Sequence, residues 1–200
     1  MSMPGSSAAS ASAQRSVPLR AADEVITTAP PKPRTTSAMR VSSVATTTAL
    51  APGTALAADA DAAMATAGLR CSPETYAHLV GDQAQGRVGG TTVVANGKGH
   101  ALYFSKRVIP HVPAAMPDPH AAVLLHLGVY AYRPAALAAY AAMPPSRLET
   151  LEGLEQLRFL EGDRPIRLVP FEPVGWDCIE LNNPEDVPVI EAVLRRRGLV

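Results

Sequence analysis

The sequence has few cysteines, no excess of charge of either sign and no long apolar run. Its two cysteines, Cys71 and Cys178, are far apart in the chain and form no C-x-x-C pair. This excludes a disulfide framework and a zinc finger, and it favours a reducing cytoplasm. The formal net charge is +0, so nothing favours nucleic acid or an anionic membrane as a partner. No stretch approaches about 18 consecutive apolar residues, so we expect no membrane span.

Aromatic residues are missing from the first 75 positions, because all nine lie between Tyr76 and Trp176. The opening segment consists largely of Ala, Ser, Thr and Pro, and it cannot bury enough apolar surface to offset chain entropy. We therefore expect residues 1–57 to be a low-complexity, mostly disordered tail and residues 58–200 to fold. A targeting segment is the alternative, because two arginines precede the first acidic residue, Asp23.

Strand and helix signals alternate along the folded part, which predicts the α/β class. Apolar alternation and β-branched residues predict the strands, and capping residues with helical periodicity predict the helices. The expected strands are 62–69, a hairpin over 91–109 that turns at Asn96-Gly97, 124–132 and 164–171. The expected helices are 72–81, 135–142, 145–162 and 182–198, with Pro188 as an alternative start of the last.

The strand LLHLGVYAY (124–132) alternates so that His126, Gly128, Tyr130 and Tyr132 share one face. Gly128 has no side chain, so open space between the polar rings is compatible with a bound hydroxylated ligand. The alternative is a histidine of the core beside two packed tyrosines.

Glu155 occupies an unusual position if residues 145–162 form one continuous helix. On a helical wheel it falls inside an apolar stripe, one turn from Leu151 and Phe159. A buried carboxylate needs a partner, so Glu155 either lines a site or pairs with Arg158.

Four phrases of the sequence together carry a family resemblance. They are GHALYFSKRVIP, LLHLGVYAYRP, LETLEGLEQLRFLEGDRPIRL and ELNNPEDV. In this order and spacing they resemble the C-terminal half of 3-deoxy-manno-octulosonate cytidylyltransferases, the CMP-Kdo synthetases, clearly from about residue 91 to 195. The resemblance implies part of a nucleotide-diphospho-sugar transferase-like (Rossmann-like) mixed sheet. It also implies Mg²⁺-dependent transfer of CMP from CTP to the sugar acid Kdo, with release of pyrophosphate.

The resemblance also implies roles for particular residues. The positions that match the family's sugar-acid contacts are Lys106, His126, Tyr130, Glu155 and Gln156. Lys106 stands where the family has an arginine, so the charge is kept but the bidentate fork is lost. Asn182 stands where the family has a metal-binding aspartate, and Glu180 or Asp177 is a candidate to supply the missing charge. A homodimer contact is implied over roughly residues 101–120.

Two motifs of the family's N-terminal half have no match in this sequence: the nucleotide-binding loop and the QGDEP stretch with its metal aspartate. The segment APPKPRTTSAMR (29–40) lacks the glycine and the residue order of that loop. We therefore assign no catalytic residue and keep two expectations: an active nucleotidyltransferase, or a non-catalytic homologue that binds a sugar acid or dimerises. Residues 1–57 would then be a native tail, a targeting segment or an aberrant remnant of the missing half, and a related sugar acid stays open.

Overall fold

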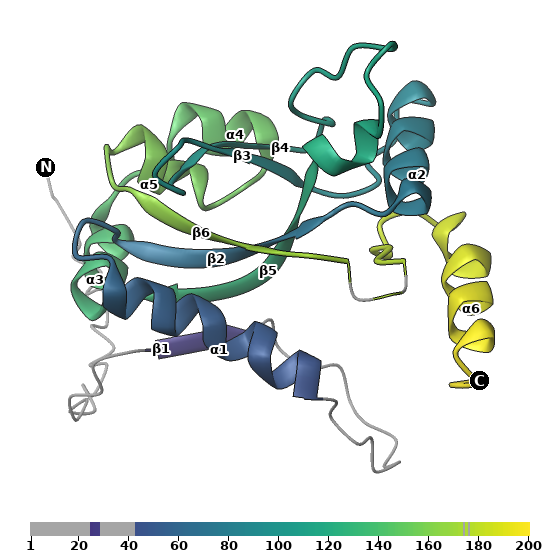
Figure 1. The fold of residues 1–200 in the computed structure, drawn as a ribbon. Helices are drawn as coiled ribbons and strands as arrows, with labels where there is room; N and C mark the ends of the chain where they lie inside the picture. Colours follow the sequence, from purple (N-terminus) through teal and green to yellow (C-terminus); the bar gives the residue numbers. More distant parts are fainter. Residues whose placement is uncertain (1–24, 29–42, 174, 176) are drawn as a thin grey trace, which may run out of the picture.

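The structure is a computed structural model that describes residues 25–28, 43–173, 175 and 177–200. The strands are β1 (Val25–Thr28), β2 (Met64–Arg70), β3 (Thr92–Ala95), β4 (Ala101–Ser105), β5 (Leu124–Tyr132) and β6 (Ile166–Phe171). The helices are α1 (Ser43–Ala58), α2 (Pro73–Ala84), α3 (Pro134–Ala142), α4 (Arg147–Glu152), α5 (Leu157–Glu161) and α6 (Asp186–Arg196), with a 3-10 turn η1 (Pro119–Ala122). These elements confirm the α/β class (Figure 1).

The strands form one mixed sheet in the order β4-β3-β5-β2-β6. β2 runs parallel to β6 and antiparallel to β5, and β3 and β4 form the expected antiparallel hairpin. β1 pairs with the end of β5, along the edge where β3 pairs with its beginning. β5 therefore has neighbours on both edges, which holds its side chains in fixed positions.

Side chains of the sheet pack on both of its faces. On one face α1 lies against the sheet, and its Leu56 is fully buried with Ala65 and Ala131 (Figure 1). The other face carries the larger core, which includes Met64, Phe104, Leu157, Phe159, Ile166 and Leu168. The neighbouring residues Met64 and Ala65 of β2 thus point to opposite faces, as alternation along a strand requires.

The segment expected as one helix over residues 145–162 is two short helices, so that prediction is wrong. The predicted capping box is present, because the Ser146 hydroxyl accepts from the Glu149 N–H and the Glu149 carboxylate accepts from the Ser146 N–H. Gly153 then adopts φ +63°, a left-handed conformation that ends α4. The expected apolar stripe does not form, and Leu151 is 68% exposed.

The boundaries of α2 and α6 also differ from the expected ones. α2 begins after Ser72, whose hydroxyl accepts from the Thr75 N–H, but it continues past Gly81 to Ala84. α6 begins at Asp186, so both of its expected starts are wrong. The Asp186 carboxylate accepts the backbone N–H groups of Asn182 and Asn183, which fixes a turn before the helix.

One strand and one helix lie in the segment that was expected to be a disordered tail. β1 and all of α1 except its last residue, Ala58, fall within residues 1–57, and the end of α1 is held by Arg133. The guanidinium of Arg133 donates to the backbone carbonyls of Leu56, Asp59 and Ala62, at distances of 2.7–2.8 Å. Ordered structure therefore begins before residue 58, and the other residues of the expected tail, including the segment 29–40, lie outside the described residues. Within the described part, no helix is long and apolar enough to cross a membrane.

Candidate functional site

A cavity of about 190 Å³ lies between β5, α3 and the segment that joins α4 to α5. Its wall, which we call the tyrosine pocket, consists of Tyr130, Tyr132, Leu137, Tyr140, Glu155, Gln156 and Phe159. Three of the positions assigned to sugar-acid contacts, Tyr130, Glu155 and Gln156, thus meet in one cavity.

The rings beside this pocket form a continuous row. The His126 ring lies 5.5 Å from the Tyr130 ring between centroids, and the Tyr130 and Tyr132 rings are 5.8 Å apart. The ring centroids of Tyr132 and Phe159 are 6.0 Å apart, and the Phe159 ring stacks on the Tyr140 ring with centroids 5.3 Å apart. The expected gap between the rings of His126 and Tyr130 is therefore absent, although the backbone at residue 128 borders open space.

His126 is buried beside Tyr130 and is not part of the pocket wall. Its Nε2 atom is 3.0 Å from the Thr66 hydroxyl oxygen, and that hydroxyl donates to the Val129 carbonyl at 2.9 Å. Since the hydroxyl proton is used there, Nε2–H of His126 is the donor to Thr66. Burial lowers the pKa of His126 to about 4, so the ring is neutral at ordinary pH.

Gln156 is the buried polar residue of the pocket wall. The residue is 6% exposed, and its side-chain Nε2 has no hydrogen-bond partner among the described residues. A buried amide without a partner costs free energy, so a ligand that accepts from Nε2 would remove that cost.

Glu155 lines the same pocket from an exposed position, so the prediction of a carboxylate buried in a helical stripe is wrong. Nor does it form the alternative pair with Arg158, whose Nε donates to Glu149 at 2.6 Å. Burial, together with the nearby Glu155 carboxylate, raises the pKa of Tyr132 to about 12. Burial also raises the pKa of Tyr130, so both phenols stay protonated and can donate.

Lys106 lies in a different cavity, of about 560 Å³, together with Arg87 and Arg107. Its backbone N–H donates to the Glu152 carboxylate at 2.9 Å. A Cβ atom added to Gly153 would be 2.9 Å from Lys106 Nζ, so the ammonium group lies against the α4–α5 turn. The structure thus places Lys106 apart from the tyrosine pocket.

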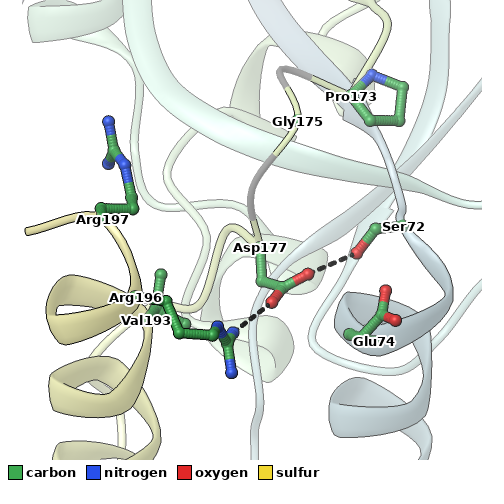
Figure 2. Close-up of a pocket in the computed structure, with 8 residues that line it drawn as sticks. All are labelled: Ser72, Glu74, Pro173, Gly175, Asp177, Val193, Arg196 and Arg197. Carbon is green, nitrogen blue, oxygen red and sulfur yellow. Dashed lines mark hydrogen bonds and ion pairs between the residues drawn. The ribbon is translucent and has the colours of Figure 1, made fainter.

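Asn182 is exposed, and its side-chain Nδ2 donates to the Glu180 carboxylate at 3.3 Å. Burial raises the pKa of Glu180, the effect expected for a partly buried carboxylate. Asp177, the other candidate for the missing charge, is already paired with Ser72 and Arg196 beside a cavity of about 550 Å³ (Figure 2). Glu180 is therefore the better placed carboxylate near Asn182.

The sequence reasoning missed four residues of the pocket wall. They are Tyr132, Leu137, Tyr140 and Phe159. Tyr132 lies on the same strand face as Tyr130, and Tyr140 is the one aromatic residue of the Ala-rich segment 134–142. Both could therefore have been predicted from the sequence as candidate pocket residues. The Arg158 guanidinium lies over the Tyr140 ring at 4.1 Å, a cation–π contact that helps fix this wall.

Comparison with known proteins identifies the family of the chain. A family model described as cytidylyltransferase matches residues 86–166. The 3-deoxy-manno-octulosonate cytidylyltransferase of Maricaulis maris is 40% identical over 143 residues, which cover 72% of this chain and 54% of that protein. The chain belongs to this cytidylyltransferase family.

Further relatives support the same family. The 3-deoxy-manno-octulosonate cytidylyltransferase of Chlorobium luteolum is 42% identical over 104 residues, 52% of this chain and 39% of that protein. A solved structure of CMP:2-keto-3-deoxy-manno-octonic acid synthetase complexed with CTP matches with a TM-score of 0.50 and 26% identity, over 74% of this chain and 55% of that chain. The chain thus spans about half the length of the curated relatives that it matches.

Proposed function

We propose that the tyrosine pocket binds a sugar acid of the 3-deoxy-manno-octulosonate type, and that the chain provides the sugar side of a cytidylyl transfer from CTP. The observation that supports this most directly is the buried, unpartnered Nε2 of Gln156 in the pocket wall. The oxygen of a sugar hydroxyl can accept a hydrogen bond from Gln156 Nε2, and the same hydroxyl can donate one to the Glu155 carboxylate.

The size of the pocket suits a small polar ligand. Pockets for drug-sized ligands have volumes of about 300–1,000 Å³. The tyrosine pocket is smaller, about 190 Å³. Its aromatic floor suits the apolar face of a sugar ring, and its phenols and carboxamide suit the hydroxyls.

In the proposed reaction, the anomeric hydroxyl oxygen of the sugar acid forms a bond to the α-phosphorus of CTP. The bond from this phosphorus to the bridging oxygen breaks, pyrophosphate leaves with that oxygen, and the hydroxyl proton is released to water. The residues of the tyrosine pocket would orient this hydroxyl rather than exchange its proton, because the Tyr130 phenol has a raised pKa. Mg²⁺ would neutralise the phosphate charge, with oxygen ligands from Glu180 and Asn182. Burial raises the pKa of Glu180, and a cation bound to this carboxylate would offset the cost of that burial.

A non-catalytic sugar-acid-binding homologue is the second candidate. It is favoured by Asn182, an exposed neutral amide where the family has an aspartate. We also propose a homodimer through roughly residues 101–120, where Leu102 is 58% exposed and Met116 is 42% exposed. We also propose a cytoplasmic location, since CTP, the nucleotide substrate of the proposed reaction, is a cytoplasmic metabolite.

Two measurements on the purified chain separate these candidates: calorimetric titration with Kdo, and pyrophosphate release with CTP, Kdo and Mg²⁺. We expect Kdo to bind, and Gln156→Ala to weaken binding about tenfold, the effect of one buried hydrogen bond. Gln85→Ala, an exposed glutamine outside the pocket, is the control that should bind as the parent does.

Each outcome has a distinct meaning. Pyrophosphate release above background supports the transferase, and Kdo binding without release supports the non-catalytic homologue. Absence of Kdo binding in a chain shown to be folded by circular dichroism would refute both. Equal weakening by Gln85→Ala and Gln156→Ala would show that the tyrosine pocket is not the binding site.

A further inference from the structure

A second cluster of polar side chains joins α2 to the start of α6, which lie at the same end of the sheet (Figure 1). It consists of His78, Asp82 and Asp186, which we call the α2–α6 cluster. His78 and Asp82 are four residues apart on α2, so they lie on the same face of that helix. The Asp82 side chain is 4% exposed and that of Asp186 is 0% exposed.

The His78 nitrogen and the carboxylate oxygens that face it form no hydrogen bonds with one another. His78 Nε2 is 3.6 Å from Asp82 Oδ2 and 3.4 Å from Asp186 Oδ1. Charge-assisted N–H···O bonds measure about 2.7–2.9 Å, so both separations are too long for one. Within the described residues, neither Nε2 of His78 nor Oδ1 of Asp186 has a hydrogen-bond partner, and both atoms are buried.

The opposite oxygens of the two carboxylates are held firmly. Asp82 Oδ1 accepts from the Arg87 guanidinium, with Nε at 3.1 Å. Asp186 Oδ2 accepts from the backbone N–H groups of Asn182 at 2.9 Å and Asn183 at 2.6 Å. The Asn183 side-chain Nδ2 bridges the two carboxylates: it donates to Asp186 Oδ2 at 3.3 Å and, at 3.2 Å, to Asp82 Oδ2, the oxygen that faces His78. Outer hydrogen bonds of this kind orient carboxylates that bind metal ions.

We propose that His78, Asp82 and Asp186 bind one divalent transition-metal ion of the Zn²⁺ type. Zn–N bonds are about 2.0–2.1 Å and Zn–O bonds about 2.0–2.2 Å, so neighbouring ligand atoms of a tetrahedral site are about 3.3–3.5 Å apart. The separation of 3.4 Å falls within this spacing and that of 3.6 Å just above it, and all three ligand atoms lie within 4.8 Å of one another. An imidazole nitrogen among the ligands selects a transition metal over Mg²⁺, which prefers oxygen.

Such an ion would connect α2 to the turn that precedes α6. Asp186 holds that turn through the backbone of Asn182 and Asn183, so the ion would stabilise the segment that includes Asn182. The role is structural, and it does not depend on the proposed cytidylyl transfer. A ligand that binds the folded chain but not the unfolded chain raises the stability of the fold. Bound metal must therefore raise the melting temperature.

The test is calorimetric titration of the chelator-treated full chain with ZnCl₂, followed by thermal unfolding with and without the metal. We expect saturable one-to-one binding and a higher melting temperature. Removal of a ligand in His78→Ala should weaken binding about 100-fold or more, beyond the 10–100-fold that outer partners are worth. The matched control is His111→Ala, which removes an exposed histidine outside the cluster and should bind like the parent. Asp82→Asn is a second, nearly isosteric variant in case His78→Ala does not fold.

Three results would overturn the metal site. One is the absence of saturable Zn²⁺ binding by the folded parent chain. Another is equal affinity of the parent, His78→Ala and Asp82→Asn, which would place the ion elsewhere. A third is a loss of stability in His78→Ala that is the same with chelator as with Zn²⁺, which would show that the cluster stabilises the fold without a metal ion. Binding of Mg²⁺ as tight as that of Zn²⁺ would contradict the assignment to a transition metal.

Discussion

His126 makes the stability of the fold depend on pH. Burial lowers the pKa of this histidine to about 4, whereas an unfolded histidine has a pKa of about 6.5. Between these values the unfolded chain binds a proton that the folded chain does not. Stability is therefore fully present above about pH 6.5 and is lost as the pH falls toward about 4.

The size of this effect follows from the two pKa values. Lowering the pH from about 7 to about 5 should reduce the free energy of unfolding by about 2 kcal/mol through His126 alone. The loss should approach about 3 kcal/mol near pH 4, where other acids also titrate. Because the Nε2–H of His126 donates to Thr66, the neutral ring has a partner and the charged ring would gain none.

The assay is urea unfolding, followed by circular dichroism, of the parent and His126→Gln at several pH values. The variant should be less stable near pH 7, but its stability should fall by about 2 kcal/mol less than that of the parent between pH 7 and pH 5. The imidazole NMR signals of His126 should also stay unchanged down to about pH 5. Parallel stability profiles for the two chains, or titration of His126 near pH 6.5, would refute the reasoning.

Two further substitutions test the local structure. Gly153→Ala should lower the free energy of unfolding by about 1–2 kcal/mol, because φ is +63° there and the new Cβ would meet Lys106 Nζ. Gly97→Ala is its control: nothing lies within 4 Å of the added Cβ, and the same loss there would contradict the argument. Arg133→Lys should cost about 1–2 kcal/mol, since an ammonium cannot fork to the three carbonyls at the end of α1. Unchanged proteolysis of α1 in that variant would count against this anchor.

Much of the sheet could be predicted because its signals are local. The strand over residues 124–132 is predicted exactly at both ends, since its alternation stops at Pro134, which begins α3. The hairpin and the start of α2 at Ser72 were predictable for the same reason, because turn and capping residues act on their own neighbours.

The structure at the N-terminus could not be predicted from composition. Residues 43–58 have no aromatic side chain and an interior Pro52, yet they form α1. Leu56 supplies the apolar contact, and Arg133, some 70 residues later in the chain, pairs with the carbonyls at its end. Such tertiary contacts override weak local propensity, and they are invisible in a window of a few residues.

Three of the positions assigned to the sugar acid line the tyrosine pocket, and Glu155 shows why their surroundings were not predicted. The helical wheel that pointed to Glu155 assumed one continuous helix, but Gly153 breaks it. The break turns residues 154–156 across the end of β5, which brings both Glu155 and Gln156 to the tyrosine pocket. The buried polar group there is the carboxamide of Gln156, and the carboxylate of Glu155 is exposed.

The exposed position of the Glu155 carboxylate limits how the proposed ligand can bind. An exposed carboxylate repels a second carboxylate but accepts readily from a hydroxyl. A sugar acid in the tyrosine pocket would therefore turn its hydroxyls, not its carboxylate, toward Glu155. Glu155→Gln should then leave Kdo affinity within about threefold of the parent at high salt, where like-charge repulsion is screened, and raise it at low salt. Calorimetric titration at two salt concentrations measures this, and a large loss of affinity at both would mean that Glu155 instead binds a cationic group or a metal ion.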